Sequence, residues 1–392
     1  MGMIKIAAAG ILALPSLLVL VVTAPIVALL SLPSLALLKF QASEAPSAAV
    51  NNDESDKDTQ EQHAIISGGS SGIGLSIAHD CIKRGMAKVT ILARNKAKLE
   101  KAVKELESTK ATCKASTIIS LRSVDVSNAA SLESTAQELL LSNNKNDKTK
   151  ESKKSSATIY LFCCAGQAHP GYFEHVSSAI FAQFTEINQL GAIYTVQAFL
   201  PLMTKGTIVL TSSMAGQLGV YGYTAYSPTK FALRGFAEVL HAELSDQPEI
   251  HIQVAFPPDT DTPGFQEEEK IKPHETRLVS ENAGLAKAED IAHEMVSAAS
   301  GSNPTFLVYF SFEGWMLSAL TSGMSPVSSL GDAVTQVALN GLFRFISLFY
   351  LNDFWRIIRN CAQERLDKGE EKKRPGESSI TETTSSENAK QD

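Results

Sequence analysis

The stretch Ser67-Gly68-Gly69-Ser70-Ser71-Gly72-Ile73-Gly74 decides the fold of this chain. It follows the apolar run 64–66 and precedes a helical pattern, so the glycines lie at a predicted strand-to-helix turn. Such a turn presents backbone N–H groups and a helix N-terminus to a pyrophosphate, although glycines also serve tight turns for purely structural reasons. The residues predicted to bind a dinucleotide here are Gly68, Ser70, Ser71, Gly72, Ile73 and Gly74.

A second motif, Tyr226-Ser227-Pro228-Thr229-Lys230, places a phenol and an ammonium one helical turn apart. Pairs at this spacing are often only surface neighbours. A nearby ammonium favours the ionised form of a phenol, which makes Tyr226 a candidate acid–base catalyst. Together with the glycine turn, the motif predicts a nicotinamide-dependent oxidoreductase.

The residue that follows the second strand indicates which nicotinamide cofactor is used. About 20 residues after the glycine turn, NAD enzymes place an acidic side chain for the ribose 2′-hydroxyl. This chain has Arg94 there and Lys98 one turn later, and cations suit a 2′-phosphate. We therefore predict NADPH as the cofactor; the alternative is that both residues are solvated cations at a helix start.

Apolar runs alternate with helical patterns along the middle of the chain, which is typical of a parallel sheet covered by helices on both faces. The strand candidates are 64–66, 89–93, 117–124, 158–162, 207–210 and 250–256. The sequence thus predicts an α/β fold with a Rossmann-type, doubly wound parallel sheet. The Lys/Asn/Ser-rich stretch 142–156 is expected to be a surface loop.

With these motifs, residues 63–265 resemble the short-chain dehydrogenase/reductase family. The resemblance implies that Asp125 and the adjacent Val126 contact the adenine end of the cofactor. It further implies that Ala165 and Gly166 border the cofactor and that Asn188 belongs to a proton relay with Lys230. Cys163 and Cys164 stand where the family usually has two asparagines, so a hydrogen bond that those asparagines make between strands is in doubt.

Two adjacent serines, Ser212 and Ser213, compete for the role of the family's active serine. Neighbours at a strand end face opposite sides, so only one of them reaches the substrate carbonyl. The spacing to Tyr226 matches the family for Ser213, which is the preferred candidate. The expected catalytic set is Ser213, Tyr226, Lys230 and Asn188, with Ser212 as the alternative serine.

The run 256–265, with Gln217-Leu218-Gly219 after the serine and Thr224-Ala225 before the tyrosine, resembles the membrane-bound branch of this family that reduces the ketone of 3-ketosphinganine, a long-chain lipid. Asp259 and Asp261 in this segment offer negative charge to the amine of such a substrate, or they merely cap the turn and the next helix. A membrane-anchored steroid or retinoid reductase is the alternative enzyme. The alternative without enzymatic activity is a non-catalytic membrane scaffold of the same fold.

Composition excludes other classes of function. The net charge is −7, from 35 basic and 42 acidic residues, so no nucleic-acid partner is expected. The five cysteines lack the spacing of a metal site, and we expect no metal and free thiols on the reducing side of a membrane. The oligomeric state stays open, with a homo-oligomer as one alternative.

An uncharged run, residues 6–38, is longer than the roughly 30 Å that a bilayer core requires. Three prolines interrupt it, so it is a kinked helix or a shallow hairpin, and a cleaved signal peptide is the alternative. The apolar runs 306–320 and 334–358 are either buried core helices or helices at a membrane interface. The resemblance implies the endoplasmic reticulum membrane, with the catalytic domain facing the cytosol.

The expected organisation therefore has five parts. They are a membrane anchor (1–40), a polar linker (41–62), a short-chain dehydrogenase/reductase domain (63–300), apolar membrane-associated helices (301–360) and a disordered polar tail (361–392).

Overall fold

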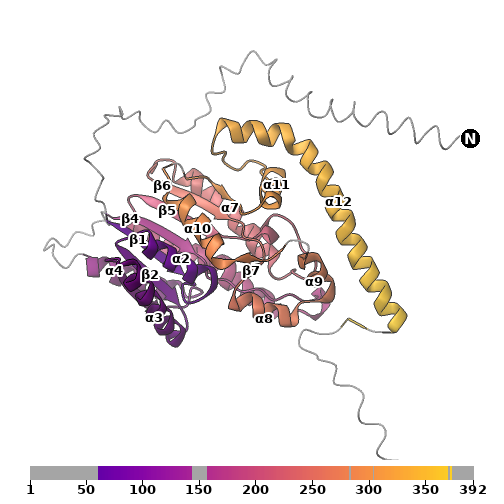
Figure 1. Ribbon diagram of the computed structural model, residues 1–392, viewed down its shortest axis with the longest axis horizontal. Coiled ribbons are helices and arrows are strands. Elements are labelled where there is room, and N and C mark those ends of the chain that lie inside the picture. The colour runs from indigo at the N-terminus through magenta and orange to yellow at the C-terminus, as the bar shows by residue number, and fades with distance from the viewer. Residues whose placement is uncertain (1–60, 144–156, 282–283, 303, 370, 373–392) are drawn as a thin grey trace, which may run out of the picture.

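The computed structural model describes residues 61–143, 157–281, 284–302, 304–369 and 371–372 (Figure 1). Its centre is a seven-stranded parallel sheet with the strand order β3-β2-β1-β4-β5-β6-β9. The strands are β1 (Gln62–Ser67), β2 (Lys88–Ala93), β3 (Ile118–Ser123), β4 (Thr158–Cys163), β5 (Gly206–Thr211), β6 (Ile250–Ala255) and β9 (Leu307–Val308). Strands β1 to β3 are added toward one edge of the sheet, and strands β4 to β9 are added toward the other edge. The switch point between β1 and β4 confirms the predicted doubly wound sheet.

Helices cover both faces of the sheet, because alternate strand residues point to opposite sides and both sides are apolar. Ile65 belongs to the core on one face, whereas Ala64 and Ile66 belong to the core on the other. The first face is packed by α4 (Ala129–Asn143), α6 (Gly191–Phe199) and α7 (Ser227–Glu243). The second is packed by α2 (Gly72–Lys83), α3 (Lys96–Cys113) and α10 (Ala288–Ser300).

The chain between β4 and α6 forms α5 (Ser178–Phe184) and a π-helical segment, Thr185–Leu190. After β6 it forms α8 (Pro263–Ile271) and α9 (His274–Glu281) beyond the carboxyl end of the sheet. Two short strands, β7 (Thr260–Asp261) and β8 (Ala286–Lys287), pair beside them. These elements stand where an open parallel sheet binds its ligands.

The sheet continues past residue 300, where the sequence places the end of the domain. Strand β9 pairs with β6, and Val254 accordingly donates its N–H to the carbonyl of Phe306. The run 306–320, expected as one apolar helix, is therefore an edge strand followed by α11 (Phe312–Leu320). Ser311 accepts a hydrogen bond from the N–H of Gly314 and so caps the start of α11.

The C-terminal helix α12 (Leu330–Lys368) is longer than expected, because residues 361–368 continue it instead of beginning a polar tail. It runs alongside the domain from α11 to α9 (Figure 1). Among the described residues it is the one helix long and apolar enough to cross a membrane, by length and composition only. Its exposed apolar side chains include Phe345, Leu348, Phe349, Tyr350 and Trp355. The expected anchor (6–38) lies outside the described residues. The expected linker and surface loop also lie outside them, except for residues 61–62 of the linker and 142–143 of the loop.

Candidate active site

A cleft of about 690 Å³ opens at the carboxyl ends of the central strands. This volume lies within the range of small-molecule and cofactor sites. The predicted catalytic and cofactor-binding residues all line the cleft except Asp125 and Asn188, which lie next to the lining residues Arg94 and Gly166, respectively. The fold thus gathers residues from the glycine turn, the end of β5 and the start of α7 into one place.

The glycine turn has a geometry that larger residues would not fit. Gly68 and Gly72 have φ angles of +72° and +55°, in the left-handed region. A Cβ on Gly74 would lie 2.5 Å from the carbonyl oxygen of Gly68. The N-cap of α2, Ser71, makes no side-chain capping hydrogen bond, so the first-turn N–H groups face the cleft without that partner. A helix start of this kind fits the pyrophosphate of a dinucleotide.

Tyr226 and Lys230 lie at the start of α7, where Pro228 occupies the first turn and favours helix initiation. Tyr226 is the N-cap, and Lys230 follows on the same face. The Nζ atom of Lys230 lies 5.6 Å from the centre of the Tyr226 ring and donates a hydrogen bond of 2.8 Å to the carbonyl of Thr211. This bond ties the catalytic helix to the end of β5.

The two serines at the end of β5 face different partners. Ser212 is buried, and its hydroxyl donates a 2.8 Å hydrogen bond to the carbonyl oxygen of Lys230. Ser213 is extended, its oxygen accepts from the N–H of Ala215 at 3.1 Å, and its hydroxyl interacts with Tyr226. The geometry therefore favours Ser213 as the serine beside the phenol, while Ser212 holds the backbone of α7.

The protonation of the pair differs from the expectation. Burial raises the pKa of Tyr226, the charge of Glu268 raises it further, the hydrogen bond with Ser213 lowers it and the charge of Asp259 raises it. Burial also lowers the pKa of Lys230 to about 8, with a small opposing effect of Cys164. Burial and the two carboxylates thus raise the phenol pKa, which is the opposite direction to the one that a nearby ammonium favours. Tyr226 is therefore a protonated donor at neutral pH.

Asn188 lies in the π-helical segment and is buried. Its amide oxygen accepts from the N–H of Gln167 at 2.8 Å, and its amide nitrogen donates to the carbonyl of Gln167 and the hydroxyl of Thr229. A Cβ on Gly166 would lie 3.4 Å from both the Asn188 oxygen and the Lys230 Nζ. Asn188 thus positions the backbone that separates it from Lys230, and π-helical segments of this kind recur at functional sites.

Cys164 replaces the expected asparagine with a weaker link between strands. Its sulfur accepts a hydrogen bond from the hydroxyl of Thr211 at 3.3 Å, which joins the ends of β4 and β5. Burial raises the pKa of the Cys164 thiol to about 11. Cys163 is buried in the apolar core. Neither thiol has the exposed, low-pKa environment of a reactive cysteine.

The cationic end of the cleft is formed by Arg94 and Lys98. Asn95 caps α3 by accepting from the N–H of Lys98 at 2.9 Å. Arg94 lies 3.7 Å from Asp125, and both side chains are half exposed. Burial alone raises the pKa of Asp125, but hydrogen bonds from Ser127 and the charge of Arg94 bring it below the usual value. This end fits a phosphorylated ribose next to an adenine ring.

Among the cleft residues that the sequence did not indicate, Glu268, Phe354 and Tyr223 lie where they bear on the proposed chemistry. Glu268 on α8 accepts a hydrogen bond from the hydroxyl of Tyr223, whose ring lies 5.6 Å from the ring of Tyr226. Phe354 reaches the cleft from α12. Glu268 sits within a run of similar charges, and Phe354 lies far along the chain, so no local signal singled them out. Tyr223 lies three residues before Tyr226, outside α7, and belongs to no motif of its own.

The two aspartates proposed to face a substrate amine separate in the structure. Asp259 lines the cleft, with its carboxylate 3.5 Å from Lys272. Asp261 is exposed, accepts a hydrogen bond from Gln266 and is not among the described residues that line the cleft. The helix α8 is capped by Thr262, which accepts from the N–H of Phe265 at 3.1 Å. Asp261 is therefore the wrong choice for a cleft residue.

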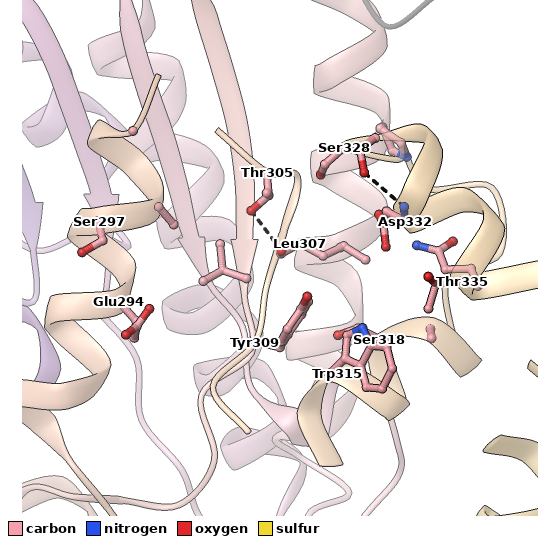
Figure 2. Close-up of a pocket in the computed structure, with 17 residues that line it drawn as sticks. Glu294, Ser297, Thr305, Leu307, Tyr309, Trp315, Ser318, Ser328, Asp332 and Thr335 are labelled. Atoms are coloured by element: carbon pink, nitrogen blue, oxygen red, sulfur yellow. Dashed lines mark hydrogen bonds between the residues drawn. The ribbon is translucent and has the colours of Figure 1, made fainter. Parts of the chain in front are cut away.

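A second cavity, of about 520 Å³, lies between α10, β9, α11 and the start of α12 (Figure 2). Figure 2 shows Tyr309 and Trp315 on one side of it and Asp332 near the start of α12. No predicted site residue lines this cavity, and the catalytic pair borders only the first cleft. The chemistry therefore belongs to the first cleft.

Comparisons with known proteins agree with this geometry. The sequence matches the short chain dehydrogenase family over residues 62–272. It is 43% identical to a 3-dehydrosphinganine reductase of Danio rerio, over 77% of this chain and 87% of the relative. It is 41% identical to a 3-ketodihydrosphingosine reductase of Bos taurus, over the same shares of the two chains.

Solved structures share the fold. An alcohol dehydrogenase from Thermococcus sibiricus, complexed with 5-hydroxy-NADP, aligns with a TM-score of 0.51 and 24% identity, over 63% of this chain and 94% of that chain. A short-chain dehydrogenase/reductase from Burkholderia phymatum, in complex with NAD, aligns with a TM-score of 0.52 and 22% identity, over 64% and 89%. At this level of identity the two structures are evidence for the fold alone.

Proposed function

Because the chain belongs to the short-chain dehydrogenase family, we propose that it reduces the ketone of 3-ketosphinganine (3-dehydrosphinganine) to dihydrosphingosine with NADPH. The observation that carries the proposal is its 43% identity, over 77% of the chain, to a reductase named for this substrate. The cleft supports it, since a serine, a tyrosine and a lysine suited to carbonyl reduction line one wall. The reaction is a step of sphingolipid synthesis.

Each catalytic group has a distinct task in this proposal. NADPH supplies the hydride when it is bound. Tyr226 donates its phenolic proton to the carbonyl oxygen, and its raised pKa keeps that proton in place until it is needed. Ser213 donates a hydrogen bond to the same oxygen as negative charge develops there. Lys230 holds the nicotinamide ribose, and Asn188 links Lys230 to solvent through a water.

The cofactor choice rests on the chain's own charges. Arg94 and Lys98 at the adenine end favour the 2′-phosphate of NADPH over the hydroxyl of NADH. One charge-assisted hydrogen bond contributes about 1.5–3 kcal/mol, enough for at least tenfold preference. The rest of the dinucleotide contacts the glycine turn and the residues Val126, Ala165 and Gly166, with Asp125 beside the adenine.

We also propose that the enzyme works at the endoplasmic reticulum membrane with its catalytic domain in the cytosol. The apolar run 6–38 and the exposed aromatic side of α12 support attachment, and the five free cysteines suit a reducing compartment. Whether a homo-oligomer forms does not enter the proposed mechanism.

The test is a comparison of substrates. Membranes containing the protein are offered NADPH with 3-ketosphinganine, a ketosteroid or retinal, and consumption of NADPH is measured. We expect the highest kcat/KM for 3-ketosphinganine. Equal or faster turnover of a steroid or retinal would mean that the fold and chemistry are right but the substrate is not. A protein with no turnover of any carbonyl compound would be a scaffold rather than an enzyme.

A further inference from the structure

We infer that Glu268 is the residue that selects an amine-bearing substrate, by accepting the ammonium group next to the reacting ketone. The inference rests on the proposed function and concerns the same cleft. It starts from a carboxylate that the fold places beside the catalytic tyrosine rather than from any sequence motif.

Glu268 reaches the site through Tyr223. Its side chain lines the cleft and is 13% exposed. The Tyr223 hydroxyl donates to its carboxylate, and the Tyr223 ring packs 5.6 Å from that of Tyr226. The charge of Glu268 acts on the pKa of Tyr226 more strongly than that of Asp259. Three carboxylates line the cleft, Asp259, Glu267 and Glu268, and of these Glu268 has the strongest effect on the pKa of the phenol.

The charges around Glu268 do not balance. Three carboxylates, Asp259, Glu268 and Glu269, surround the buried ammonium of Lys272, at 3.5 Å and 3.4 Å for the first two. The one further cation at the cluster is Arg277, which lies 3.5 Å from Glu269 and not beside the cleft carboxylates. Among the described ion pairs, three negative charges therefore face two positive ones. An additional cation entering the cleft would compensate the excess.

Burial strengthens the effect of this excess negative charge. The pKa of Glu268 is raised, first by burial and also by the charge of Asp259, against the lowering effects of Tyr223 and Lys272. A carboxylate in this position gains more from a cation than an exposed one does, because solvent screens it less. The opposite end of the cleft carries Arg94 and Lys98, so an anionic cofactor and a cationic substrate are attracted to different ends.

The substrate chemistry fits the position. In 3-ketosphinganine the amine is bonded to the carbon next to the carbonyl carbon, so it lies beside the group that Tyr226 and Ser213 contact. An amine next to a carbonyl has a pKa near 8, and a neighbouring carboxylate favours its protonated form. Steroid ketones and retinal have no such amine. Glu268 therefore separates the proposed substrate from the alternatives by charge and not only by shape.

The test measures the amine preference of the full-length enzyme and of two variants. The preference is kcat/KM for 3-ketosphinganine divided by kcat/KM for its N-acetyl derivative, both with saturating NADPH. Glu268→Gln keeps the shape but removes the charge. Glu269→Gln is the matched control, because Glu269 contacts the same lysine from outside the cleft. We expect Glu268→Gln to lower the preference at least about tenfold and Glu269→Gln to change it less than about twofold.

Turnover of the N-acetyl derivative separates selection from structure. If Glu268 selects the amine, Glu268→Gln lowers kcat/KM for 3-ketosphinganine more than kcat/KM for the N-acetyl derivative, because an effect through the pKa of Tyr226 is shared by both substrates and cancels in the ratio. An unchanged preference in Glu268→Gln, or an equal loss on both substrates, would overturn the inference. If Glu268→Gln does not fold, Glu268→Ala is measured instead, because it also removes the charge, and an unaltered preference there has the same consequence. A wild-type enzyme that reduces neither lipid would contradict the proposed function itself.

Discussion

At the residue scale, catalysis depends on which side chains point toward the reacting carbonyl. Ser212 and Ser213 are neighbours in the sequence, but their hydroxyls point to the main chain of α7 and to the catalytic phenol, respectively. Tyr226 is buried with a raised pKa, whereas the pKa of Lys230 is lowered. Burial of the site thus shifts the pKa values of the two groups in opposite directions, because it disfavours the charged form of each.

The first prediction concerns the serines. Ser213→Ala should lower kcat by about 100-fold, because one hydrogen bond to the developing oxyanion is lost. Ser212→Ala should change kcat only a few-fold but lower the free energy of unfolding by about 1 kcal/mol, because a buried hydrogen bond to α7 is lost. Steady-state kinetics and urea unfolding check both values. The opposite ranking of the two kcat values would assign the catalytic role to Ser212.

The second prediction concerns the proton donor. Tyr226→Phe should lower kcat by about 10²–10⁴-fold, since the ring stays and only the transferable proton is removed. Binding of NADPH, followed by its fluorescence, should remain within a few-fold of wild type. Lys230→Ala is the comparison, because it should weaken both turnover and cofactor binding. A Tyr226→Phe enzyme with near-normal kcat would place the proton donor elsewhere.

At the scale of elements, two parts of the chain shape the cleft from opposite sides. The glycine turn between β1 and α2 brings backbone close to the cofactor end, and α12 closes the other side with Phe354. α12 is attached to the domain at α11 by packing of Phe343 against Trp315 and at α9 by the ion pair of Arg365 with the buried Glu275. A helix held at both ends keeps its middle against the cleft.

The third prediction compares two glycines. In Gly74→Ala the new Cβ would overlap the carbonyl of Gly68, so unfolding should become easier by about 1–3 kcal/mol and NADPH binding should weaken. Gly235→Ala is the control, because Gly235 lies inside α7 with no neighbouring atom within 4 Å of the new Cβ. It should stabilise the protein by about 0.5–1 kcal/mol through helix propensity. Thermal unfolding with and without NADPH measures both, and a neutral Gly74→Ala would contradict the tight-turn argument.

The fourth prediction tests α12 as part of the substrate site. Phe354→Ala should raise KM for 3-ketosphinganine about tenfold through lost apolar contact, but should hardly affect a short-chain 2-amino-3-ketone. Trp355→Ala is the matched control, since Trp355 is the next residue, is 58% exposed and is not among the cleft residues. Equal effects of Phe354→Ala on long and short substrates would mean that α12 does not recognise the lipid tail of the substrate.

At the scale of the whole molecule, charge and apolar surface are distributed in a way that suits a lipid enzyme. Cations lie at the adenine end of the cleft and carboxylates at the other end, near Tyr226. Four exposed aromatic side chains lie on α12, which also contributes Phe354 to the cleft; they are Phe345, Phe349, Tyr350 and Trp355. A lipid arriving from a membrane surface and a water-soluble cofactor can therefore use separate approaches to one site.

The fifth prediction concerns the orientation in the cell. In sealed microsomes, protease added from outside should digest the catalytic domain, because we expect it to face the cytosol. Detergent should make no difference to that digestion, and a lumenal protein assayed in the same vesicles serves as the control for sealing. Protection of the domain until detergent is added would place it in the lumen.

The sequence by itself determined the fold class, the cofactor turn and the catalytic motif, because each is a local pattern. Six of the seven described sheet strands were found because each contains an apolar run, and five of them, all except the edge strand β3, are buried on both faces. Strand β9 was missed because Leu307–Val308 is a two-residue edge strand, too short for periodicity. The start of the polar tail was placed too early for a related reason, since helix α12 continues through a charged stretch up to its glycine cap, Gly369.

Only the tertiary structure decided which side chains share the cleft. It separated Ser212 from Ser213 by the direction of each hydroxyl, and it removed Asp261 from the substrate side. It brought in Glu268 and Phe354, whose places depend on how α8 and α12 pack against the sheet. The direction of the phenol pKa shift also required the fold, because burial is a property of the packed molecule and is the largest cause of the raised pKa of Tyr226. Local patterns specify elements and motifs, whereas distances between distant segments exist only once the chain has folded.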